Sequence, residues 1–176
     1  MKHALLFTLT ISLVFGCKSS EARRPISNNS GSFIDASIER NKQLNNKEYA
    51  QIASFIKNSE RPFLSSDFGF WYAYNTKIDT NTLTPKFGDL VYYTYLLKTL
   101  DGQVIYSANK EIQTYYIDQQ ELFSGLRQGL KLMKNGEAIT FLFPSQKAYG
   151  YYGDNDKIGS NVPLICEVSL LKLTKN

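Results

Sequence analysis

The sequence predicts an α+β fold that is dominated by antiparallel sheet, and two observations support this. Between residues 90 and 173, short segments of alternating apolar side chains are separated by turn-forming residues, which is the pattern of antiparallel strands. Only one short segment within this stretch, ending near Leu130, has apolar residues at helical spacing. Several strands with a single short helix among them are typical of an α+β domain whose core is built mainly by the sheet.

Before this domain, residues 33–86 predict an extension of one helix and one strand. Asn45 and Glu48 have the spacing of a capping box. The apolar face that follows consists of Tyr49, Ile52, Ala53 and Ile56. The helix should end at Arg61, because a residue before proline disfavours helical backbone. The aromatic segment from Asp67 to Asn75 predicts a strand.

Residues 87–176 contain the alternating segments of the main domain. Leu90 to Lys98 predicts a strand, and Asp101-Gly102 predicts a hairpin turn because these residues tolerate positive φ. The remaining predicted strands are Gln103 to Ala108, Gln113 to Ile117, Ala138 to Phe143 and Leu164 to Leu173.

One helix and one long loop complete the predicted domain. Asp118 and Glu121 have the spacing of a capping box, so the helix should begin there and run to about Leu130. The loop from Pro144 to Pro163 contains several glycines, and a loop of this length in a compact domain is usually functional.

The N-terminus has the features of an export signal. Residues 1–16 contain a charged start and a short apolar run, which is too short to span a bilayer. The end of this run, Gly16-Cys17, resembles the lipidation box of bacterial lipoproteins, in which Cys17 becomes the acylated first residue. An ordinary signal peptide with an incidental cysteine is the alternative. Residues 17–32 are rich in Ser, Asn and Arg and predict a flexible tether to an outer membrane.

Composition excludes several kinds of chemistry. The chain has 176 residues, of which 43% are hydrophobic and 14% aromatic, enough for a substantial core. Its one histidine, His3, lies in the predicted signal, so imidazole-dependent hydrolysis and HExxH zinc chemistry are excluded. A net charge of +4 with both signs interspersed does not indicate nucleic-acid binding. No metal or cofactor is expected.

The segment from Phe87 to Thr174 contains a series of short motifs in a fixed order. They include Gly88-Asp89-Leu90-Val91, Leu100-Asp101-Gly102, Gly125-Leu126-Arg127-Gln128-Gly129-Leu130, Ala148-Tyr149-Gly150 and Pro163-Leu164. In these motifs and their order, the segment resembles the FKBP-type peptidyl-prolyl isomerase family. The resemblance implies a twisted antiparallel sheet wrapped around a short helix, and proline-containing polypeptides as clients. Tyr149 to Gly153 and Ile158 to Pro163, on a predicted lipoprotein, further resemble the isomerases associated with gliding motility.

The resemblance also implies the residues of a site. It assigns catalytic roles to Tyr95, Phe123 and Tyr149: the backbone N–H of Phe123 and the hydroxyl of Tyr149 would each hold a carbonyl. The implied substrate-binding residues are Ile105, Tyr106, Tyr115, Leu122, Leu126, Ile158 and Cys166. Tyr95 and Leu126 lie on predicted buried faces, so a role in the core alone is the alternative for both.

Four of these positions depart from the common family pattern. Leu126 stands where tryptophan is common, Ile105 where phenylalanine is, Tyr106 where aspartate is, and Cys166 where an aromatic residue is. These departures argue against macrolide binding, but a wider apolar cavity still accepts a prolyl ring. Two other hypotheses are a non-catalytic module that binds proline segments and a structural lipoprotein that docks through residues 33–86.

Overall fold

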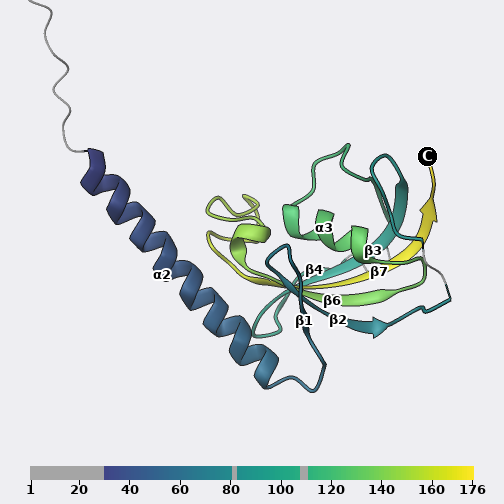
Figure 1. Ribbon diagram of the computed structural model, residues 1–176, viewed down its shortest axis with the longest axis horizontal. Helices are drawn as coiled ribbons and strands as arrows, with labels where there is room; N and C mark the ends of the chain where they lie inside the picture. Colours follow the sequence, from purple (N-terminus) through teal and green to yellow (C-terminus); the bar gives the residue numbers. More distant parts are fainter. Residues whose placement is uncertain (1–29, 81–82, 108–110) are drawn as a thin grey trace, which may run out of the picture. The chain divides into compact units, whose positions relative to one another are not determined.

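The computed structural model describes residues 30–80, 83–107 and 111–176. The predicted signal, Cys17 and most of the predicted tether lie outside the described residues. The helices are α2 (Ser30–Lys57), α3 (Ser124–Leu132) and the 3-10 helix η1 (Ser145–Lys147). The strands are β1 (Leu64–Ser65), β2 (Trp71–Thr76), β3 (Leu90–Thr99), β4 (Val104–Ser107), β5 (Gln113–Tyr116), β6 (Ala138–Phe143) and β7 (Leu164–Thr174) (Figure 1). In the described residues, no helix is both long enough and apolar enough to cross a bilayer.

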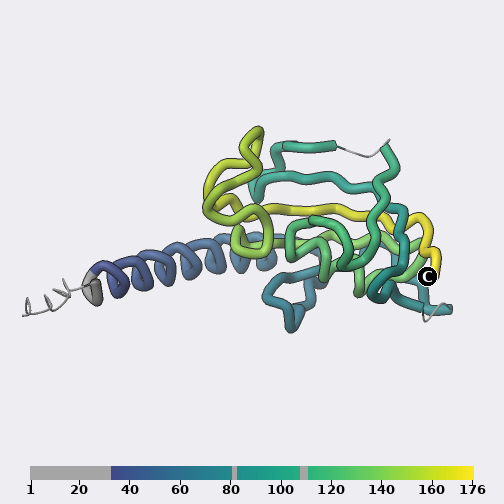
Figure 2. The backbone as a smooth tube through the Cα atoms, turned by 90° about the horizontal axis from the view of Figure 1, so that it is seen from above, coloured from purple at the N-terminus to yellow at the C-terminus, as the bar shows by residue number. Residues whose placement is uncertain are grey.

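Within these residues, the strands form one sheet in the order β1-β2-β6-β7-β3-β4, and β5 pairs with the first part of β3. Every pairing is antiparallel. The long strands β3 and β7 run side by side through the domain, with Leu90 opposite Thr174 and Thr99 opposite Leu164 (Figure 2). The predicted α+β fold, an antiparallel sheet with a short helix, is confirmed.

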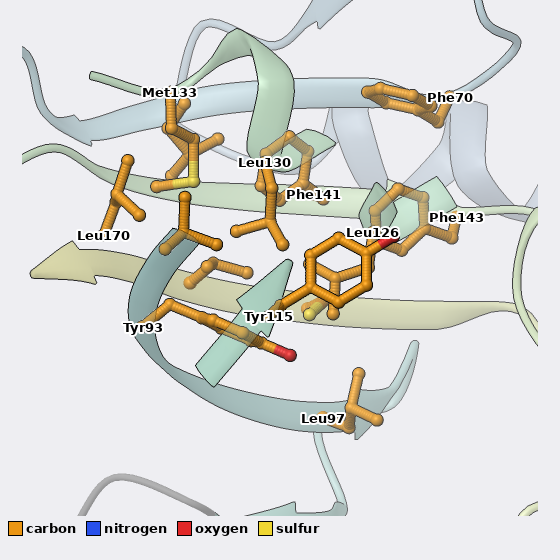
Figure 3. Packing of buried hydrophobic residues seen from close by; sticks show 14 of the residues in the cluster. Phe70, Tyr93, Leu97, Tyr115, Leu126, Leu130, Met133, Phe141, Phe143 and Leu170 are labelled. Carbon is orange, nitrogen blue, oxygen red and sulfur yellow. The ribbon is translucent and has the colours of Figure 1, made fainter. Parts of the chain in front are cut away.

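The core lies between helix α3 and the sheet. Leu126 and Leu130 of α3 are buried among Phe141 and Phe143 of β6 (Figure 3). Close approach depends on Gly125, because a Cβ atom there would lie 2.5 Å from Cδ1 of Phe143 and 2.7 Å from the carbonyl oxygen of Lys147. The absence of a side chain on one face of α3 therefore sets the spacing between helix and sheet.

Helix α2 is longer than predicted. It begins at Ser30, so Asn45 and Glu48 lie inside the helix and the predicted capping box is wrong. The residues of α2 before Asn45 are mostly polar, exposed helix formers. They lack the regular spacing of apolar residues from which a helix is predicted. Ile52 is buried, packing with Leu142 and Ile165, but Ala53 is exposed rather than on the buried face.

Helix α3 starts later than predicted. It begins at Ser124 with Phe123 as the N-cap, and Leu122 precedes the helix. Asp118 lies in a turn after β5 with a φ of 58°, and its carboxylate accepts a hydrogen bond from Nζ of Lys131 at 2.9 Å. The carboxylate therefore pairs with the far end of the helix instead of capping its start.

Two further sequence predictions are confirmed, and one predicted strand starts later than expected. The hairpin between β3 and β4 turns at Asp101-Gly102, where Gly102 has a φ of 90° and donates its N–H to Thr99. Strand β6 has the predicted bounds. The strand expected from Asp67 starts only at Trp71, because the chain turns at Gly69, which has a φ of 79°.

Candidate active site

A cavity of about 380 Å³ opens between β3, β5 and the segment that precedes α3. Its walls come from these elements and from the loop after η1. The lining residues are Tyr93, Tyr95, Gln113, Thr114, Tyr115, Gln120, Glu121, Leu122, Phe123, Leu126 and Tyr149. A neighbouring cavity of about 560 Å³ shares several of these residues and adds Arg127. The two cavities are lined by aromatic rings together with polar side chains such as Gln120 and Glu121.

The structure brings six of the ten site residues named from the sequence around the smaller cavity. These six are Tyr95, Tyr115, Leu122, Phe123, Leu126 and Tyr149. The other four do not line it: Ile158 and Cys166 are buried in the core, and Ile105 and Tyr106 pack against the core cluster.

Tyr93 was not among the residues named from the sequence, yet it lines the cavity beside Tyr95. The two residues share a face of β3 because side chains alternate along a strand, and their ring centroids are 6.1 Å apart. Burial raises the pKa of Tyr93, with a smaller contribution from Tyr95. The sequence signal that could have identified Tyr93 is its place two residues before Tyr95 on the predicted buried face.

Phe123 and Tyr149, from two separate segments of the chain, form another aromatic wall of the cavity. Their ring centroids are 5.1 Å apart, and the Phe123 ring also meets Phe143 edge-on at 5.5 Å. Phe123 is the N-cap of α3, and backbone N–H groups at a helix start have no intrahelical acceptor. This wall therefore combines an apolar surface with backbone donors that face no carbonyl of their own helix.

Tyr149 supplies a hydroxyl group to the cavity. Burial raises its pKa to about 12, with smaller electrostatic contributions from Tyr95, Asp154 and Cys166. Burial also raises the pKa of Tyr95 and of Tyr115. The hydroxyls therefore stay protonated at neutral pH and can donate hydrogen bonds to a bound carbonyl.

These shifts predict a flat pH profile. A tyrosine hydroxyl donates only while it is protonated, and a raised pKa extends that range upwards. We expect kcat/KM for a proline peptide to be constant between about pH 6 and about pH 9, where none of these tyrosines with a raised pKa loses its proton. Peptide exchange measured across this range tests the prediction, and a bell-shaped profile would contradict it.

Tyr106 holds the loop after Gly153 instead of lining the cavity. Its hydroxyl donates to the carboxylate of Asp154 and to Oδ2 of Asp156, the latter at 3.0 Å. Asp154 Oδ1 also accepts the backbone N–H of Ile158 at 2.7 Å. Burial alone would raise the pKa of Asp154, but these hydrogen bonds lower it below its usual value. Tyr106 therefore secures the glycine-rich loop.

Cys166 lies on β7 and is fully buried. Burial raises the pKa of its thiol, so it stays protonated and unreactive. Nowhere in the described part of the chain do three or more His, Cys, Asp or Glu side chains gather in a way that could hold a metal ion.

Comparison with known families identifies the domain. Residues 81–171, just over half of the chain, match the family model of FKBP-type peptidyl-prolyl cis-trans isomerases. The chain belongs to this family. It is 33% identical over 89 residues to a probable FKBP-type peptidyl-prolyl cis-trans isomerase, FkpA, of Neisseria meningitidis serogroup B. That match covers 51% of this chain but only 33% of the relative, so the chain spans a third of that relative's length.

Other FKBP-type proteins are similar over the same region. The chain is 29% identical over 101 residues to human peptidyl-prolyl cis-trans isomerase FKBP2, which covers 56% of this chain and 71% of the relative. A crystal structure of a Pseudomonas syringae peptidyl-prolyl cis-trans isomerase superposes with a TM-score of 0.64 at 21% identity, covering 76% of this chain and 96% of that one. FkpA from Escherichia coli gives a TM-score of 0.58 at 20% identity, covering 99% and 82%. These two structures share the fold of this FKBP-type domain.

Proposed function

We propose that this chain catalyses the cis–trans isomerisation of Xaa-Pro bonds in exported or envelope proteins. The observation that supports this is the cavity walled by Tyr93, Tyr95, Tyr115, Phe123 and Tyr149 with Leu126 between them. Its aromatic rings and Leu126 lie beside the polar side chains of Gln113, Thr114, Gln120 and Glu121. The hydroxyl groups of Tyr93 and Tyr149 are protonated donors. Such a cavity suits a prolyl ring and the carbonyl that precedes it.

The chemistry requires neither a nucleophile nor a cofactor. Rotation about an Xaa-Pro bond has a barrier of about 18–20 kcal/mol, because the amide has partial double-bond character. A cavity with aromatic walls removes water from the amide and can bind the twisted form more tightly than either planar form. The Tyr149 hydroxyl and the N–H of Phe123 would each hold a carbonyl oxygen while the amide rotates.

The setting that we propose for this activity is supported by the N-terminal sequence. The charged start, the short apolar run and Cys17 support export and lipid anchoring in an outer membrane, with the domain facing the periplasm. The segments Tyr149 to Gly153 and Ile158 to Pro163 support a place among the isomerases associated with gliding motility. Clients would then include proline-containing segments of envelope machinery.

The direct test is exchange spectroscopy by NMR on a Leu-Pro peptide with the purified full-length chain. The wild-type protein should accelerate exchange, and Tyr149→Phe should lower kcat about fivefold, since one neutral hydrogen bond is worth about 1 kcal/mol. Tyr152→Phe is the matched control because Tyr152 is 83% exposed and does not line the cavity.

Each outcome separates the hypotheses. A folded wild-type protein that does not accelerate exchange would remove the isomerase assignment. Peptide chemical shifts that change without faster exchange would favour a module that only binds proline segments. Equal losses in the Tyr149 and Tyr152 variants would show that the site lies elsewhere.

A further inference from the structure

Glu48 is a buried carboxylate on helix α2. Only 2% of its surface is exposed, while its neighbour Lys47 faces solvent. Its Oε2 atom accepts the backbone N–H of Ser145 at 2.8 Å, and its Oε1 atom accepts the Ser145 hydroxyl at 2.7 Å. In the described residues, none of the ion pairs includes Glu48. A buried carboxylate is tolerated only when it is hydrogen-bonded, so both contacts from Ser145 are needed.

Ser145 in turn organises the turn that carries Tyr149. The Ser145 carbonyl accepts the N–H of Ala148 at 2.9 Å and the N–H of Gly150 at 2.8 Å. These two residues flank Tyr149 on both sides. The backbone around Tyr149 is therefore tied at two points to the residue that Glu48 holds.

A second contact joins the same two segments. Nε2 of Gln146 donates to the hydroxyl of Tyr49 at 2.7 Å, one residue along from each partner of the first contact. At the other side of the turn, the hydroxyl of Ser124 lies 3.4 Å from the carbonyl oxygen of Lys147. The turn thus lies between α2 and the first residue of α3, which directly follows Phe123.

We propose that Glu48 is a positioning residue for the active site. By holding Ser145, it fixes the turn through Ala148 and Gly150 so that the Tyr149 ring stays against Phe123 and lines the cavity. The inference rests on the proposed isomerase function for its catalytic consequence. It gives helix α2 a role in catalysis that is separate from the docking role considered for residues 33–86.

The test compares Glu48→Ala, Glu48→Gln and Glu39→Ala in the full-length chain. Glu39 is the matched control because it lies on the same helix, is exposed and bonds only to Gln43 among the described hydrogen bonds. Relative to the amount of folded protein, Glu48→Ala should lower kcat about tenfold with little change in KM. A displaced Tyr149 would stabilise the transition state less, and such a loss lowers kcat rather than raising KM. Glu48→Gln, which retains an acceptor oxygen, should restore most of kcat, and Glu39→Ala should match wild type.

Amide hydrogen exchange supplies a readout that does not depend on catalysis. In Glu48→Ala, the amides of Ala148 and Gly150 should exchange about tenfold faster or more. The amide of Gly136, which donates to Leu170 at 2.8 Å in another part of the sheet, should be unchanged. Uniformly faster exchange at all three amides would indicate general destabilisation and overturn the positioning role.

The outcomes separate this inference from the proposed function. A wild-type chain without isomerase activity but with a selective exchange effect would overturn only the catalytic consequence. An active wild type with unchanged kcat and unchanged amide exchange in Glu48→Ala would overturn the inference alone. If Glu48→Ala does not fold, Ser145→Ala provides the same test, because it keeps the backbone contact with Glu48 and removes the hydroxyl contact. Wild-type kcat and wild-type amide exchange in Ser145→Ala would equally overturn the positioning role of Glu48.

Discussion

Replacement of Gly125 by alanine is expected to lower the free energy of unfolding by about 2 kcal/mol, since overpacking a dense core typically costs about 1–3 kcal/mol. A Cβ atom at this position would lie 2.5 Å from Cδ1 of Phe143 and 2.7 Å from the carbonyl oxygen of Lys147. Neither the backbone carbonyl nor a ring that also packs against Phe70 can move freely. Urea unfolding measures the change directly.

The matched control for this prediction is Gly159→Ala. A Cβ atom at Gly159 would meet only Val162, at 4.0 Å, and the residue does not have a positive φ. We expect the free energy of unfolding to change by less than about 0.5 kcal/mol there. Alanine normally stabilises a helix relative to glycine, so an increase in stability for Gly125→Ala would contradict the packing of α3 against β6.

Replacement of Phe123 by alanine is expected to lower kcat/KM for a proline peptide about 100-fold, because loss of a positioning wall lets the reacting group move by about 1 Å. The ring contacts both Phe143 and Tyr149, so its removal opens the cavity and frees the Tyr149 ring. Peptide exchange by NMR at several peptide concentrations gives kcat and KM for the variant.

Phe87→Ala serves as the control for the loss of a phenylalanine. Phe87 is 70% exposed and does not line the cavity, so activity should remain within about twofold of wild type. Urea unfolding of Phe123→Ala must remain cooperative for the comparison to hold. Activity close to wild type in a folded Phe123→Ala protein would place the site away from the start of α3.

Much of the sheet could be predicted because strands carry a local signal. The alternation of Val91, Tyr93, Tyr95 and Leu97 identified the core face of β3, and Asp101-Gly102 identified its hairpin. Helix starts were less predictable. Asp118 and Asn45 both begin capping-box patterns, yet Asp118 pairs with Lys131 and Asn45 lies within α2, since a short polar pattern also fits turns and helix interiors.

The candidate site was also only partly predictable from the sequence. Its residues were named from a family resemblance, and six of the ten line the cavity. Tyr106 does not, because its hydroxyl is taken by the carboxylates of Asp154 and Asp156. Tyr93 lines the cavity without having been named, although its place two residues before Tyr95 on the same face of β3 was a local signal.

The sequence by itself determined the fold class, the strand faces and the absence of imidazole chemistry after residue 3, because side-chain alternation and residue content are local properties. Only the tertiary structure decided which aromatic rings share a cavity and what a buried carboxylate binds. Glu48 and Ser145 are 97 residues apart, and nothing near either residue indicates the other. Such contacts arise when strand pairing brings distant segments together, so they depend on the whole chain.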